Sequence, residues 1–242
     1  MKYIRAILIV LVVVLAAVAQ GFSRTAAQTG AALGLIIVSV PAVLLAVAAA
    51  FSRAKQRTYQ QVFSPQKADT ALSLLSALCL AVGGVLQLMQ GGLVWAGLGI
   101  LCMLAAFGLA MGAIYRQRGK NPPARCYVPA VLFYALRLFR DFRHWMVDPA
   151  ILDYCFLLFA VISFMLAAYH MGAFSFDRGD SRALTFFALS GVYFCAASTG
   201  FISLKADGFV FGGSALWLLA CLLQMSGYMQ AQKPAQSPAE EQ

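Results

Sequence analysis

The chain has 242 residues, of which 62% are hydrophobic and 11% charged, and it carries a formal net charge of +9. Globular soluble proteins are nearer half apolar and a quarter charged, so one soluble core could not bury this much apolar surface. The composition excludes an ordinary soluble domain and predicts an all-α polytopic membrane protein, for which lipid is the main solvent.

The first apolar segment, near residues 4–20, follows a basic start and allows two interpretations. Ala17-Val18-Ala19 before Gln20 has the small-residue pattern of a signal-peptide cleavage site. A chain whose second span comes this early needs no cleavable signal to insert, which favours a retained helix. Cleavage would remove residues 1–19 and leave six spans.

Six further apolar segments are long enough to cross a hydrocarbon core about 30 Å thick at about 1.5 Å per residue. They lie near residues 30–51, 70–89, 92–115, 149–171, 182–203 and 209–229. The sequence therefore predicts a bundle of seven spans in a single transmembrane domain, residues 1–231. The polar, proline-bearing residues 232–242 are predicted to be a disordered tail.

Between the fourth and fifth spans, residues near 129–147 are predicted to form an amphipathic helix. At about 100° per residue, Arg137, Arg140 and His144 share one face with Asp141, and apolar side chains gather on the other. Such a helix lies in the plane of the membrane interface, with its cations toward lipid phosphates. We therefore expect Arg137, Arg140 and His144 to form a face for lipid head groups.

The start of the fifth span carries two acids. Asp148 precedes Pro149 as an N-cap precedes the first helical residue. Asp153 lies about 6 Å further along the helix axis, near the inner boundary of the hydrocarbon. Intramembrane acids are costly unless paired, and they often mark function. The sequence predicts a cluster of Asp153 with Arg140, Arg143 and His144, and leaves open whether it is an ion pair or a functional site.

The later spans contain polar side chains that can either bond across helices or line a narrow cavity. The residues concerned are Tyr193, Ser198, Thr199 and Gln224. The sequence does not decide between the two roles.

Cations tend to accumulate on the cytoplasmic side of membrane proteins. With a cytoplasmic N-terminus and seven spans, the 18 Lys and Arg residues all lie in cytoplasmic segments except Arg24, Arg178, Arg182 and Lys233. This predicts a multi-pass protein of a bacterial cell membrane, its C-terminus outside. The basic loops imply contact with anionic lipid on the inner leaflet and exclude nucleic acid as a partner.

We found no catalytic motif, no zinc spacing among the six cysteines and no phosphate-binding loop, so we expect no enzyme, cofactor or metal site. The favoured hypothesis is a non-enzymatic membrane component whose basic cytoplasmic face contacts anionic lipid or a partner protein. The alternative is a small-solute or ion transporter or channel with Asp153 near its inner gate. A third hypothesis, an enzyme acting on lipid head groups, requires His144, Asp148 and Asp153 to converge.

Overall fold

The structure is a computed structural model that describes residues 2–29, 33–52, 58–63, 67–145, 151–199, 202 and 205–231. Its elements are α1 (Lys2–Thr29), α2 (Leu33–Phe51), α3 (Tyr59–Val62), α4 (Lys67–Met89), α5 (Leu93–Gln117), the short 3-10 helix η1 (Ala124–Cys126), α6 (Val128–Trp145), α7 (Ile151–Phe174), α8 (Ser181–Ser198) and α9 (Lys205–Ala231). No strand occurs in these ranges, which confirms the predicted all-α class.

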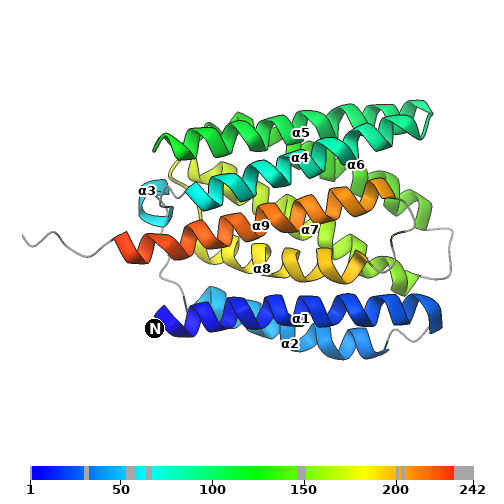
Figure 1. The fold of residues 1–242 in the computed structure, drawn as a ribbon, viewed down its shortest axis with the longest axis horizontal. Helices are drawn as coiled ribbons and strands as arrows, with labels where there is room; N and C mark the ends of the chain where they lie inside the picture. The colour runs from blue at the N-terminus through cyan, green and yellow to red at the C-terminus, as the bar shows by residue number, and fades with distance from the viewer. Residues whose placement is uncertain are drawn as a thin grey trace, which may run out of the picture.

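The long helices lie side by side along one direction and form a bundle with two ends (Figure 1). At the left end in that view, α1 begins, and α5 and α9 finish. We call it the Arg116 end, after a residue in the last turn of α5. The right end, which holds the α4–α5 turn, is called the Arg137 end.

Small residues set the close approach of α4 to its two neighbours. A Cβ atom added to Gly99 of α5 would lie 2.8 Å from the carbonyl oxygen of Gly84 in α4, so the two backbones touch there. Likewise, a Cβ on Gly213 of α9 would lie 3.0 Å from the carbonyl oxygen of Ser76, whose hydroxyl donates to the Gly213 carbonyl at 2.7 Å. Small residues serve this purpose in membrane bundles, where backbones pack closely.

Four helices contain segments long and apolar enough to cross a membrane. The segments are Ala68–Met89, Leu93–Gln117, Cys155–Phe174 and Lys205–Met225. Shorter apolar stretches, Ile7–Ser23 and Ile36–Phe51, lie in α1 and α2. All seven predicted spans coincide with helices (α1, α2, α4, α5, α7, α8 and α9), but length and hydropathy support membrane crossing for four of them. The fold is that of a membrane-embedded helical bundle.

The helix α6, which the sequence predicts to lie flat on the membrane, packs along α5 and α7. A Cβ on Gly108 of α5 would overlap the carbonyl oxygen of Cys126, and Trp95 of α5 stacks under Arg140 of α6. These contacts are separated by about 20 Å along both helices, at about 1.5 Å per residue, so the two run antiparallel. The structure shows α6, Val128–Trp145, packed along α5; whether this helix lies at a membrane interface stays a prediction.

The placement of α6 changes the route of the chain. Because α6 runs from the Arg116 side toward the Arg137 end, the chain makes one more traverse than the seven predicted. As a result, α1 begins and α9 finishes at the same end of the bundle (Figure 1). The side of a membrane that each end faces stays a prediction. Residues 232–242, the predicted tail, lie outside the described residues.

Aromatic side chains form the centre of the packing between α6, α7 and α9. Phe164 of α7 lies between Tyr134 of α6, at a ring-centroid distance of 4.3 Å, and Trp217 of α9, at 5.1 Å. All three side chains are fully buried. Burial of large aromatic rings contributes much of the apolar stabilisation of a core, so one face of α6 is packed into the bundle, while residues such as Leu136 and Phe139 remain exposed on the other.

Candidate functional site

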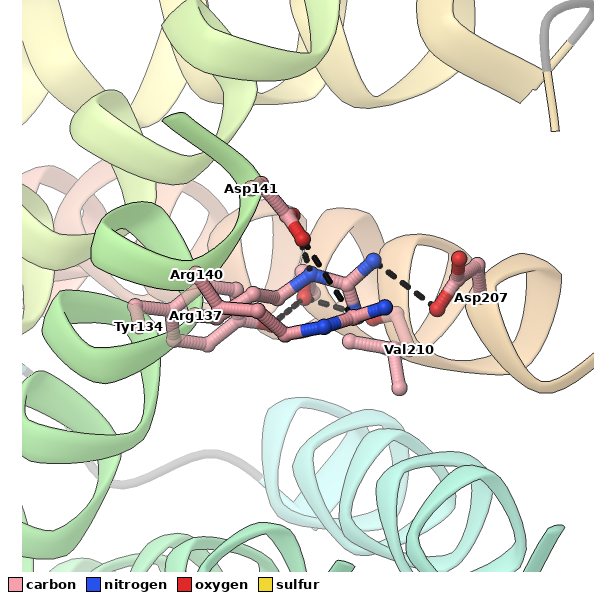
Figure 2. Close-up of polar contacts among 7 residues, drawn as sticks. Tyr134, Arg137, Arg140, Asp141, Asp207 and Val210 are labelled. Carbon is pink, nitrogen blue, oxygen red and sulfur yellow. Dashed lines mark hydrogen bonds and ion pairs between the residues drawn. The ribbon is translucent and has the colours of Figure 1, made fainter. Parts of the chain in front are cut away.

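The polar face of α6 ends in a buried ionic network. Nη2 of Arg137 lies 2.8 Å from Oδ1 of Asp207 in the first turn of α9, and its Nε lies 3.3 Å from Oδ2 of Asp141. Figure 2 shows the Arg137 guanidinium between the two carboxylates, which come from different helices. Asp141 also pairs with Arg140, at 3.3 Å. The positive charges of Arg137 and Arg140 are thus neutralised by the carboxylates of Asp141 and Asp207 within the protein.

Apolar and aromatic groups enclose this network. The Arg137 side chain is 3% exposed, and its guanidinium lies over the Phe211 ring at 5.0 Å. Arg140 lies over the Trp95 ring at 3.6 Å, a cation–π contact that fastens α6 to α5. One turn from Arg137, the hydroxyl of Tyr134 bonds to that of Ser214 in α9. The network therefore holds α6 against both α5 and α9.

The predicted head-group face of Arg137, Arg140 and His144 does not fit Arg137. Its charge is directed to Asp207 inside the protein, because burial of an arginine requires a paired carboxylate. Arg140 is half-exposed and occupied by Asp141 and Trp95. The side chain of His144 lies outside the described part of the structure.

The predicted cluster around Asp153 is not tested by the described side chains. Asp153 is in the first turn of α7, but its side chain, like that of His144, is not among those described, and Asp148 lies in the undescribed residues 146–150. Arg143 is exposed near the end of α6. Whether Asp153 pairs with Arg140 or Arg143 therefore stays a prediction.

A second buried arginine lies at the opposite end. Arg116, 4% exposed, donates from Nη1 to Oε1 of Gln224 at 2.9 Å, and the same nitrogen is 4.0 Å from the Cys221 sulfur. Asp69, in the first turn of α4, is also buried. Nε and Nη2 of Arg116 and Oδ2 of Asp69 have no hydrogen-bond partner. Arg116 thus links α5 to α9, and its unpaired donors make it a strongly polar point inside an apolar bundle.

The short helix α3 packs at the same end of the bundle as Arg116 (Figure 1). Tyr59 and Phe63 stack at a centroid distance of 4.9 Å, and Phe63 packs edge-on against Phe174 of α7 at 5.3 Å. Burial raises the pKa of Tyr59 far above its usual value, and the positive charge of Arg116 offsets part of that rise. Tyr59 is therefore a neutral phenol at physiological pH.

The four residues predicted as possible cavity lining do not gather around one space. Tyr193 of α8 bonds to the hydroxyl of Ser39 in α2 at 2.9 Å, whereas Ser198 and Thr199 donate to carbonyl oxygens of their own helix. Gln224 lies at the Arg116 end and accepts from Arg116. These hydrogen bonds fit the first of the two predicted roles, bonding within and between helices.

A groove opens between α6 and α7 on the outside of the bundle. It has a volume of about 920 Å³, within the ~300–1,000 Å³ range of small-molecule sites. Its lining is mainly apolar and includes Val128, Leu132 and Ala135 of α6, with Tyr169, His170 and Phe176 following on the α7 side. Arg178, in the turn after α7, provides its charged residue. A second, smaller pocket of about 330 Å³ lies between α2 and α8.

Sequence reasoning missed Asp207, Asp69, Arg116 and Trp95 as members of polar clusters. Each charged residue of this group lies within the first or last turn of an apolar helix, and an ionisable residue at that position is a signal worth weighing. Their partners come from distant parts of the chain, so the sequence alone could not pair them. Comparison with protein-family models, with curated proteins and with solved structures gives no match.

Proposed function

We propose that this chain is a non-enzymatic membrane component whose basic end contacts anionic lipid. The observation that carries the proposal is the exposure of Arg118, Lys120, Arg125 and Arg178 at the Arg116 end, with one exposed acid, Asp177, in the same described loops. Exposed cations beside a membrane gain about 1 kcal/mol each from an anionic leaflet. An acidic surface of a partner protein could be bound through the same exposed cations.

The distribution of cations supports a cytoplasmic location for this end. In the described helices and turns, the Arg116 end holds Lys2, Arg5, Lys67, Arg116, Arg118, Lys120, Arg125, Arg178 and Arg182. The Arg137 end holds Arg24, Arg137, Arg140, Arg143 and Lys205. Asp141 and Asp207 neutralise part of the second group. The positive-inside rule then assigns the Arg116 end to the cytoplasm of a multi-pass protein in the cell membrane, with both ends of the described chain on that side.

The transporter hypothesis, with Asp153 near an inner gate, has less support. The pockets described above lie on the outside of the bundle and have mainly apolar lining. Arg137 and Asp207 could have bound an ion in a transport pathway, but their charges are paired with each other. The hypothesis of an enzyme acting on lipid head groups depends on the side chains of His144, Asp148 and Asp153, which lie outside the described part.

The proposal is tested by measuring lipid preference. The full chain, purified in mild detergent, is given equal amounts of phosphatidylglycerol and phosphatidylcholine, and the retained lipids are counted by native mass spectrometry. The protein should favour phosphatidylglycerol. In the double variant Arg118→Gln/Lys120→Gln this preference should fall about thirtyfold, because each of the two cations contributes about 1 kcal/mol at an anionic surface.

The matched control removes two exposed cations from the other end, with Arg143→Gln/Lys205→Gln. It should keep the preference for phosphatidylglycerol, since these residues lie at the Arg137 end. Equal binding of both lipids by the unmodified protein, or an equal loss in both double variants, would contradict the proposal.

A further inference from the structure

We infer that the groove between α6 and α7 binds one anionic phospholipid, with an acyl chain along the helices and its phosphate at Arg178. This inference rests on the proposed function and names a specific site for it. It follows from the shape of the groove, from its position on the outside of the bundle and from the charge at one end.

The shape comes from small residues at the floor of the groove. Ala135 of α6 and Ala168, Gly172 and Ala173 of α7 line the groove, and none of these side chains extends beyond Cβ. Larger residues on both sides form the walls. The lining runs from Val128 to Ala135 on α6, which is about 10 Å along the helix axis and matches an extended piece of hydrocarbon chain.

The apolar side chains of the groove walls are largely exposed, which is unfavourable in water and favourable against lipid. Val128 is 58% exposed, Leu132 48%, Tyr169 61% and Phe176 69%. Apolar side chains exposed together mark a surface that contacts lipid or another protein. In a bundle whose neighbouring segment Cys155–Phe174 is long and apolar enough to cross a membrane, the molecules that meet this surface are lipids.

The polar end of the groove fits a phosphate. Arg178 is exposed and lines the groove in the turn that follows α7. Its backbone amide donates to the carbonyl of Ala173 at 3.1 Å, and Ser175 in the same turn donates to the carbonyl of Pro122 at 2.6 Å. These bonds fix the turn against the loop that precedes α6. An exposed arginine on a fixed turn at one end of an apolar groove is suited to a lipid phosphate, with which its guanidinium makes strong charge-assisted hydrogen bonds.

The described contacts include no ion pair of Arg178. Asp177 is next in sequence, but it is exposed, and the structure shows no ion pair between the two side chains among the described contacts. His170, on the groove wall, stacks against Phe187 of α8 at a centroid distance of 5.6 Å. It therefore belongs to the wall more than to the head-group site.

The site is tested with a phosphatidylglycerol that carries a photoreactive diazirine in one acyl chain. After irradiation of the full chain in mild detergent, peptide mapping should place the adduct on residues 128–135 or 168–176. Ala135→Phe, which fills the floor of the groove, should remove most of this adduct. Arg178→Gln should weaken its formation about fivefold to tenfold, as expected for the loss of one charge-assisted contact. Lys205→Gln, an exposed cation at the other end, should leave it unchanged.

The two proposals fail in different ways. If phosphatidylglycerol shows no preference over phosphatidylcholine in any assay, the proposed function and this site both fall. If the preference is present but the adduct maps elsewhere, or persists in both Ala135→Phe and Arg178→Gln, the proposed function stands and the groove assignment is overturned. Because Arg178 is exposed, its variant tests the site even if Ala135→Phe fails to fold.

Discussion

Replacing Asp207 with Leu removes the carboxylate that lies 2.8 Å from Nη2 of Arg137. At that distance and an effective dielectric constant of about 20, the attraction between the two charges is about 6 kcal/mol before desolvation is subtracted. Asp141 remains 3.3 Å from Nε of Arg137, so the guanidinium keeps one carboxylate. We therefore expect the free energy of unfolding to fall by about 3 kcal/mol, the lower end of the range for breaking a buried pair.

A double-mutant cycle separates the ion pair from general disruption. Arg137→Met should also destabilise the bundle, whereas Arg137→Met/Asp207→Leu replaces both charges by apolar groups and should cost about 2 kcal/mol less than the sum of the single variants. Reversible unfolding by dodecyl sulfate in mixed micelles, followed by tryptophan fluorescence, measures the three values. The exposed control Asp177→Asn should stay within about 0.5 kcal/mol of the unmodified chain. Additive effects, within about 0.5 kcal/mol, would refute the reasoning.

Three further predictions concern the fold. Gly108→Ala should destabilise the bundle by about 1–3 kcal/mol, because the added methyl group meets the backbone carbonyl of Cys126, whereas Gly97→Ala, with open space around it, should be neutral or stabilising in the same unfolding assay. Single cysteines introduced at Arg118 and Arg143 in a cysteine-free chain should react with an impermeant maleimide from opposite sides of the membrane, and labelling from one side would show that α6 lies flat. Tyr193→Phe should cost about 1 kcal/mol through loss of the 2.9 Å bond to Ser39, and no change in the unfolding midpoint would contradict that contact.

The class of the protein could be predicted from the sequence because the relevant signals are local. Apolar length and hydropathy are properties of consecutive residues, and each of the seven predicted segments is a helix in the structure. The small residues of α4 and α5 and the amphipathic pattern of residues 129–147 are equally visible along the chain. None of these local patterns identifies the groups that the polar face of a helix contacts in the folded protein.

The position of α6 was decided by the tertiary structure for that reason. A cationic face such as that of Arg137 and Arg140 can be satisfied by lipid phosphates or by carboxylates of another helix, and the local pattern is the same in both cases. Asp207 and Trp95 supply the second solution from distant segments. The same holds for Arg116 and Gln224, which are 108 positions apart in the chain and 2.9 Å apart in the bundle. Sequence determined which segments avoid water, because transfer of a side chain depends on its own chemistry. Only the folded bundle determined which buried charges meet, because pairing depends on two positions that the local pattern does not relate.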